Sequence, residues 1–505
     1  MTRILQRVSQ MNILLSAVLG ELTTRSINFL IKNSVKPTAP DVDDRLRRIL
    51  LRAQVIVDEA MGRQITNRGI LQQLDMLRDA MHHGYYIIDT FRYQSHSEEE
   101  AKGQVLSKSL SLLKVVNSLQ GLYSSSRSTQ IFEQLQKSLD DLSSVINDME
   151  EIVVFLMSYP RIYRQPYSMH LLVGNCMFGR QMETELVISF LLHTQPHAPK
   201  ELEVLPIVGP GKVGKTTLVA HVCEDARVRD HFSEILFLHG HDLTGVDLAA
   251  LKERYVTEHR NHGSNSNKEG RRLLIVVELV GTLTEDVWNR LCSAYMRHVP
   301  SGSKIIVTSQ SDEIIKFGTT RALSLKYLSH EAYWYFFKMV TFGSMDPEMH
   351  PKLARMAMEI AGMMNGCFIS ANMMGCLLRD NIDFHFWCKV LAFLRGTIKQ
   401  HVSKFGGHPV DLIIEKKPAH LGRMFTPSED FVLHSEYQRS SQEDVPKIRV
   451  QDVIYGSVKA QGKFEALGWR SRIPPYHSYV NVCEIRELKT MGTKRKRCMK
   501  NRVAL

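Results

Sequence analysis

Residues 204–223 read VLPIVGPGKVGKTTLVAHVC. The apolar run VLPIV comes first, GPGKVGKT at 209–216 matches the pattern GxxxxGK[ST], and an apolar stretch of helical spacing follows. A strand before this pattern and a helix after it form the setting in which such a loop holds phosphate groups. A glycine-rich turn without a ligand is the alternative, and that setting disfavours it. The sequence therefore predicts a phosphate-binding loop inside an α/β domain with a parallel sheet.

The residue types of this loop suit an anionic ligand. Gly209 and Gly214 let the backbone adopt positive φ angles and approach phosphates closely. Unpaired N–H groups at a helix N-terminus attract anions. Lys215 is placed to reach the β- and γ-phosphates, and the Thr216 hydroxyl is placed to ligate Mg²⁺. We therefore expect ADP or ATP to bind with Mg²⁺ at six residues: Gly209, Gly211, Gly214, Lys215, Thr216 and Thr217.

An acid further along the chain is a candidate second half of this site. Leu273–Val277 is an apolar run, and Glu278 follows it directly. A carboxylate at the end of a strand can hold Mg²⁺, usually through water, and can orient an attacking water. We therefore expect Glu278 to be a metal-binding and catalytic residue. The alternative is an acid that only ends a strand.

Apolar spacing divides the chain into parts. Residues 1–160 predict a helical bundle, with helices at about 4–33, 41–62, 66–93 and 129–157. The prolines near 160–166 indicate a linker over 161–174. Over 175–328, apolar runs alternate with helical stretches, which is typical of a parallel sheet covered on both faces. These runs are Val204–Val208, Ile235–Leu238, Leu273–Val277, Lys304–Thr308 and Leu323–Leu325.

Two further regions are expected towards the C-terminus. Residues 329–400 return to helical spacing and predict a small helical domain. Residues 401–505 lose periodicity among Pro, Gly, Ser and charged residues, which predicts an irregular, partly disordered tail. The predicted fold class is therefore multidomain, with α and α/β parts.

Positive charge is concentrated at the C-terminal end. The net charge is +11, but residues 489–505 contribute +7 without an acid, which leaves +4 for residues 1–488. This distribution disfavours a nucleic-acid-binding body. The run Lys494–Arg497 (KRKR) fits a nuclear-import sequence bound by an import receptor, and a solvated basic tail is the open alternative.

The remaining composition indicates a cytoplasmic protein, or one that is also nuclear. The eight cysteines form no CxxC pair and have no regular spacing, as expected of reduced thiols. We find no apolar run of membrane-spanning length and expect no membrane span.

The order of motifs resembles that of plant disease-resistance proteins of the coiled-coil/NB-ARC type, over about residues 1–395. FGR at 178–180 resembles a segment that lines the family's adenine pocket, and LLIVVE at 273–278 resembles its acidic strand. SGSKIIVTSQ at 301–310 resembles a strand that usually ends in arginine, and NGCFIS at 365–370 stands where the family has Gly-Leu-Pro-Leu-Ala. The resemblance implies further nucleotide-binding residues: Phe178, Gly179, Arg180, Gln310 and Phe368.

Departures from the family pattern fall at the site. Gln310 replaces the phosphate-sensing arginine, Leu279 replaces a second acid, and Phe368 replaces a proline that contacts adenine. An arginine beside the terminal phosphate can be worth orders of magnitude in rate. The missing arginine therefore predicts nucleotide binding with slow or absent hydrolysis.

Other departures lie outside the site. Leu77–Tyr93 aligns with the family's acidic helix motif, in which Tyr85 and Tyr86 replace acids and Asp89 remains. After residue 400 we find neither the Met-His-Asp motif nor a leucine-rich repeat.

Three functions remain open at this point. The first is an ADP/ATP-binding signalling switch of the plant innate-immune receptor type, acting in defence through protein partners that dock on the helical bundle. The second is a non-hydrolysing adaptor or decoy that pairs with full-length receptors. The third is a competent P-loop ATPase with another role, against which Gln310 and Leu279 argue.

Overall fold

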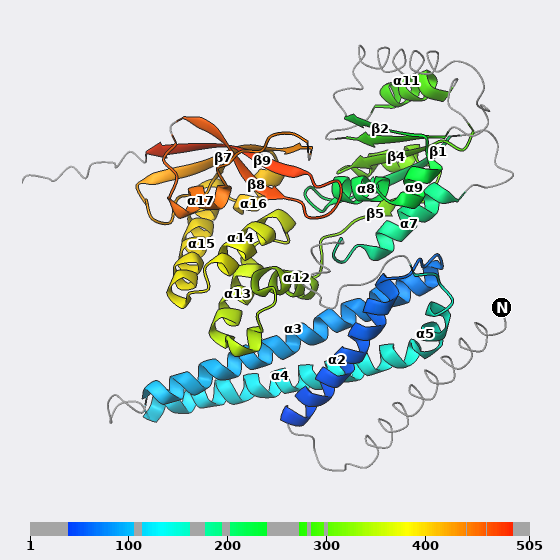
Figure 1. The fold of residues 1–505 in the computed structure, drawn as a ribbon. Helices are drawn as coiled ribbons and strands as arrows, with labels where there is room; N and C mark the ends of the chain where they lie inside the picture. Colours follow the sequence, from blue (N-terminus) through cyan, green and yellow to red (C-terminus); the bar gives the residue numbers. More distant parts are fainter. Residues whose placement is uncertain are drawn as a thin grey trace, which may run out of the picture.

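The computed structural model describes residues 39–105, 114–161, 177–193, 202–239, 272–279, 284–296, 301–440, 442–460 and 462–487. The predicted helix at 4–33, most of the predicted linker and the basic tail lie outside these residues. Figure 1 shows a helical bundle, a parallel α/β domain, a second helical region and an antiparallel sheet, in chain order. The predicted multidomain class with α and α/β parts is confirmed.

The bundle consists of α2 (Ala39–Met61), α3 (Arg68–Val105), α4 (Lys114–Asp148) and α5 (Glu150–Leu156). On α2 the buried residues Val42, Leu46, Leu50 and Ala53 recur every three or four positions, so they form one apolar stripe. This stripe packs against buried residues of α3 and α4, among them Leu77 and Leu135. Helix α3 continues to Val105, beyond the predicted helix end near residue 93.

The α/β domain contains five parallel strands in the order β2-β3-β4-β1-β5. They coincide with the five predicted apolar runs: β1 (Glu203–Val208), β2 (Glu234–His239), β3 (Leu273–Glu278), β4 (Lys304–Ser309) and β5 (Leu323–Ser324). The described helices of this domain are α7 (Gln181–Leu192), α8 (Lys215–Cys223), α9 (Ala226–His231) and α11 (Glu285–Met296).

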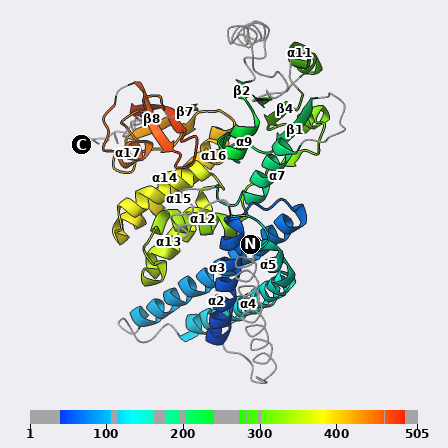
Figure 2. The same ribbon diagram turned by 45° about the vertical axis from the view of Figure 1, so that its right-hand side comes forward.

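Helices cover both faces of this sheet because the side chains of each strand alternate between faces. Leu205 and Ile207 of β1 join one core with α7, α8 and α9. Val208 joins the other core, with Trp288 and Leu291 of α11. Figure 2 shows α11 and α7 on opposite sides of the sheet. Parallel strands buried on both faces explain why the runs in the sequence are continuously apolar.

The second helical region consists of α12 (His330–Phe342), α13 (Pro351–Met363), α14 (Phe368–Asp380) and α15 (Phe384–Phe405). Its core contains the fully buried Trp334, Phe337 and Trp387. Helix α12 also packs against α3, so this region lies on the bundle, as Figure 1 shows.

A buried ionic network joins α12 to the bundle. The Asp89 carboxylate accepts hydrogen bonds from Lys338 Nζ at 2.6 Å and from Trp334 Nε1 at 2.7 Å. Asp89 is 5% exposed and Lys338 is 7% exposed, so each charge depends on the other. Asp89 is the acid that remains in the motif at Leu77–Tyr93. It therefore holds the bundle on the second helical region.

The prediction of an irregular tail over 401–505 is wrong for most of that segment. It contains α16 (Pro409–Ile414), α17 (Val450–Tyr455) and an antiparallel sheet of β6 (Ala419–His420), β7 (Glu429–Arg439), β8 (Lys463–Arg470) and β9 (Ser478–Glu487). The strand order is β6-β7-β9-β8, and Phe431, Val453 and Cys483 lie in its core. Irregular register in β7 and β8, near Leu433 and Leu467, interrupts the alternation of buried residues that would have indicated strands.

Within the part of the chain that the structure describes, no helix is both long enough and apolar enough to cross a membrane.

We expect Asp89→Ala to weaken the junction between α3 and α12 strongly, because it leaves the Lys338 ammonium buried without its acid. Loss of one member of a buried pair costs about 3 kcal/mol or more. Hydrogen exchange of the α3 and α12 amides measures the effect. Glu348→Gln is the control: Glu348 lies in the short 3-10 turn after α12 and pairs with Arg92 of α3, but it is half-exposed, so its loss should cost at most about 1 kcal/mol. Equal effects of the two substitutions would contradict the assignment.

Candidate functional site

The loop between β1 and α8 has the backbone of a phosphate cradle. Gly214 caps the N-terminus of α8 with φ of 99°, a conformation that glycine adopts without strain. A Cβ on Gly209 would lie 2.4 Å from the carbonyl oxygen of Leu325, so no larger residue fits beside β5. The loop is thus shaped by β5 on one side and opens α8 on the other.

Lys215 is a buried cation at the centre of this loop. Its Nζ donates hydrogen bonds to the carbonyl oxygens of Gly209 at 2.7 Å and Pro210 at 2.8 Å, and the side chain is 9% exposed. Burial lowers the pKa of Lys215 to about 8, and the nearby negative charge of Glu278 opposes this shift only partly. A bound anion would stabilise the charged form of this amine.

The Thr216 hydroxyl and the Glu278 carboxylate meet directly. Thr216 stands in the first turn of α8, Glu278 ends β3, and the hydroxyl donates a hydrogen bond to the carboxylate. Parallel pairing of β3 with β4 fixes the position of the acid, since Glu278 lies opposite Thr308. A hydroxyl and a carboxylate in contact provide the oxygen ligands that Mg²⁺ prefers.

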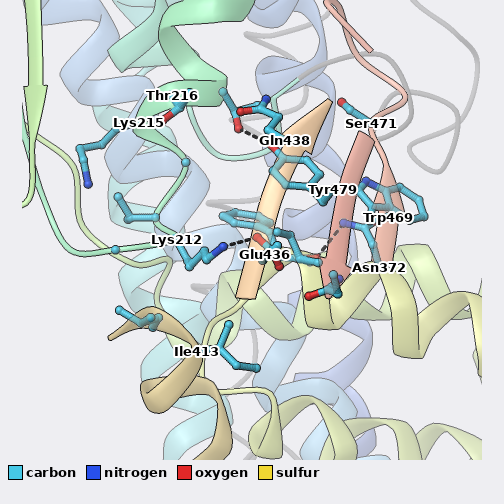
Figure 3. Close-up of a pocket in the computed structure, with 18 of the residues that line it drawn as sticks. Lys212, Lys215, Thr216, Asn372, Ile413, Glu436, Gln438, Trp469, Ser471 and Tyr479 are labelled. Atoms are coloured by element: carbon cyan, nitrogen blue, oxygen red, sulfur yellow. Dashed lines mark hydrogen bonds and ion pairs between the residues drawn. The ribbon is translucent and has the colours of Figure 1, made fainter. Parts of the chain in front are cut away.

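A cavity of about 600 Å³ extends from this loop to the C-terminal sheet. Its wall includes α8, α12, α14, α16 and β7 to β9, and Figure 3 shows side chains from several of these elements around it. Ten of the twelve predicted site residues line the cavity: Phe178, Arg180, Gly211, Gly214, Lys215, Thr216, Thr217, Glu278, Gln310 and Phe368. Gly179 and Gly209 do not line it. The ligand contacts of these residues stay predictions.

The side chain of Arg180 positions the loop. Its guanidinium is 4% exposed and donates hydrogen bonds to the Glu183 carboxylate and to the carbonyl oxygens of Val213 and Lys326. It therefore ties the start of α7 to the phosphate loop and to the chain that leaves β5.

Aromatic side chains connect the cavity to the bundle. The ring of Phe178 stacks on Tyr335 with centroids 6.0 Å apart and contacts Phe336 at 5.4 Å. The same ring lies 5.4 Å from His82 of α3. Phe336 in turn makes an edge contact with Phe368. The predicted base-binding end of the cavity thus lies on the junction between α12 and α3.

Sequence reasoning missed three residues that touch the phosphate loop from other parts of the chain. Tyr327 donates a hydrogen bond from its hydroxyl to the Gly211 carbonyl at 2.7 Å. Lys212 forms an ion pair with Glu436 of β7, and the Tyr479 hydroxyl of β9 lies 3.1 Å from Thr217 Oγ1. No local pattern identifies Glu436 or Tyr479, because their proximity to the loop depends on a sheet far along the chain.

These residues fit a nucleotide with Mg²⁺. The glycines leave the N-terminus of α8 accessible, a buried ammonium faces the loop, and an acid and a hydroxyl adjoin it. Aromatic side chains at the other end suit a planar base. The geometry therefore matches the chemistry predicted from the loop.

Comparison with known proteins agrees with the resemblance found in the sequence. Residues 181–346 match the family model of the NB-ARC domain. A putative disease resistance protein RGA1 of Solanum bulbocastanum is 27% identical over 231 residues, which are 42% of this chain and 22% of that protein. Disease resistance protein RGA2 of the same species is 24% identical over 69% of this chain and 35% of that protein.

A putative disease resistance RPP13-like protein 1 of Arabidopsis thaliana is 24% identical over 69% of this chain and 34% of that protein. The resemblance to disease-resistance proteins of the NB-ARC type is therefore confirmed, while the chain spans about a third or less of the length of these relatives. Among solved structures, C. elegans PCH-2 aligns over 44% of this chain and 70% of that chain, with 16% identity and a TM-score of 0.30.

We expect Gly209→Ala and Lys215→Ala both to abolish nucleotide binding, for different reasons. The added methyl group would collide with the Leu325 carbonyl and move the loop, whereas loss of Lys215 removes the buried charge. Titration with a fluorescent nucleotide measures both. Gly407→Ala is the control, since a Cβ there meets no atom within 4 Å. Binding by Lys215→Ala with unchanged affinity would show that the ligand lies elsewhere.

Nucleotide affinity is expected to fall as pH rises through about 8. Below the lowered pKa, Lys215 is charged before and after binding; above it, binding must include uptake of a proton. The loss should approach at most about tenfold per pH unit. Titrations between about pH 7 and 9.5 avoid the titration of the phosphate itself. Calorimetry at pH 8 in buffers of different ionisation enthalpy should detect the proton that is taken up on binding. A nucleotide affinity that does not change over this pH range would refute the role of Lys215.

Proposed function

We propose that this chain, with its NB-ARC match over residues 181–346, is a nucleotide-binding signalling switch of the plant innate-immune type. It holds ADP or ATP with Mg²⁺ and acts in defence through protein partners. The observation that supports this most is one cavity of about 600 Å³. It extends from the phosphate loop, past Thr216 and Glu278, whose oxygens suit Mg²⁺, to Phe178, the aromatic side chain that contacts the bundle.

Different groups around the cavity hold different parts of the nucleotide. Lys215 and the N-terminal N–H groups of α8 bind the phosphates, and Thr216 and Glu278 hold Mg²⁺, which neutralises phosphate charge when it is bound. Phe178 and Phe368 line the end that receives the base. Arg180 keeps the loop in place through its two carbonyl contacts.

The proposed switch hydrolyses nucleotide slowly. A Cβ on Gly211 would lie 3.3 Å from Gln310 Nε2, so the uncharged amide packs directly against the phosphate loop. An arginine at such a position would stabilise charge on a terminal phosphate, and an amide does so weakly. Glu278 can orient water but supplies no positive charge.

The aromatic contacts provide the physical connection between nucleotide and partner. Phe178 lines the cavity and packs against both Tyr335 of α12 and His82 of α3. A ligand that moves Phe178 would therefore act on the junction that Asp89 and Lys338 hold closed. We propose that nucleotide state sets the position of the bundle in this way and controls access of partners to it.

A second candidate is a non-hydrolysing adaptor that pairs with full-length receptors of the same type. The uncharged Gln310 favours it, since a bound nucleotide would then stabilise the fold without turnover.

We also propose that the protein is cytoplasmic and enters the nucleus through an import receptor bound to Lys494–Arg497, a proposal that rests on the sequence alone.

The wild-type chain is expected to show an ATP turnover far below the roughly 1 s⁻¹ of an ordinary slow enzyme. Gln310→Arg should raise the single-turnover rate, because it places a cation beside the phosphate loop; Gln310→Lys controls for charge without the planar guanidinium. Quenched-flow measurement with radiolabelled ATP gives the rate. A wild-type rate of about 1 s⁻¹ or faster would favour the third function, a competent ATPase.

A further inference from the structure

We propose that Glu436 and Tyr479 of the C-terminal sheet are ligand-site residues, and that Glu436 makes the cavity select a nucleoside diphosphate over a triphosphate. This inference rests on the nucleotide site proposed above. It concerns which residues outside the NB-ARC match set the preference for phosphate number. Figure 3 shows both side chains at the cavity, with Glu436 directed at Lys212 of the phosphate loop.

Lys212 occupies an unusual position for its residue type. Its backbone φ is 60°, in the left-handed region that an L-residue adopts at a cost. The side chain reaches across the cavity to the Glu436 carboxylate and forms an ion pair with it. This pair holds the second lysine of the loop against the C-terminal sheet.

Glu436 is well shielded from solvent for an acid. Its side chain is 9% exposed and lines the cavity, so water screens its charge weakly. Because Lys212 already neutralises Glu436, this lysine has little positive charge to offer a ligand. Lys215 remains the loop cation whose hydrogen-bond partners are neutral carbonyl groups.

Tyr479 approaches the loop from the neighbouring strand. Its hydroxyl lies 3.1 Å from Thr217 Oγ1, in the first turn of α8, and burial raises the pKa of this phenol. Tyr479 is therefore a neutral group that restrains the helix start that binds phosphate. The loop after β8 adds a second tie, since His221 Nδ1 lies 3.2 Å from the Pro474 carbonyl oxygen.

Charge balance at the loop favours two phosphates. A third phosphate adds negative charge beside an acid that little solvent screens, and Lys212 could neutralise it only by leaving Glu436 unpaired. A diphosphate can be bound by Lys215 and the α8 N-terminus without disturbing that pair. The C-terminal sheet thus contributes a repulsive element, which is how a site commonly rejects a close relative of its ligand.

Affinities of ADP and ATP for the full chain, measured with Mg²⁺ by competition against a fluorescent nucleotide, test this inference. Glu436→Gln should improve binding of ATP relative to ADP by about tenfold, since the amide keeps the shape and removes the charge. Lys212→Gly suits the positive φ and leaves Glu436 unpaired, so ATP should lose more affinity than ADP. The double variant should cancel this loss, because the two residues act as one unit.

Two further variants separate charge from structure. Tyr479→Phe removes only the hydroxyl and should weaken both nucleotides equally, which leaves their ratio unchanged. Asp430→Asn removes an acid of β7 that pairs with His420, and neither residue lines the cavity, so this variant should match the wild type. A Glu436→Gln variant with the wild-type ratio of affinities would overturn the inference and leave the nucleotide site standing. Wild-type protein that binds neither nucleotide would overturn both.

Discussion

The ε-amino group of Lys215 is buried in a loop whose own carbonyl oxygens are its hydrogen-bond acceptors. A cation in that place costs free energy unless an anion compensates it, and the lowered pKa expresses this cost. The surrounding strands position the groups around this amine. The loop follows β1, the chain at the end of β5 leaves no room for a side chain at Gly209, and β3 places Glu278 beside Thr216. The parallel sheet is thus the rigid support on which an anion site is built.

Two surfaces of the chain meet around that site from opposite directions. The helical bundle adjoins it through His82, whose ring contacts the cavity-lining Phe178, and the buried pair of Asp89 with Lys338 keeps the bundle in place. The C-terminal sheet reaches it through Glu436 and Tyr479, which contact the loop and the first turn of α8. The cavity itself is lined by the α/β domain, the second helical region and the C-terminal sheet. This arrangement suits a protein whose nucleotide controls how its parts are placed.

The sequence predicts the parallel strands and the phosphate loop, because both depend on residues that are adjacent in the chain. Continuous apolar runs identified all five parallel strands, because strands buried on both faces need no alternation, and Gly214 with Lys215 marked the loop. The C-terminal sheet was missed because its half-exposed strands contain charged residues and irregular register near Leu433 and Leu467. Glu436 and Tyr479 could not be found in advance, since only the tertiary fold brings them to the loop. The pairing of Asp89 with Lys338 joins residues 249 positions apart and was equally hidden.

The most direct test of this account is native mass spectrometry of the full chain purified without added nucleotide. We expect most molecules to carry the mass of one nucleoside diphosphate, and Lys215→Ala protein of the same fold to carry none. Intact wild-type protein that neither retains nucleotide on purification nor takes it up when ADP and Mg²⁺ are added would contradict the claim that the cavity at Lys215 is a nucleotide site.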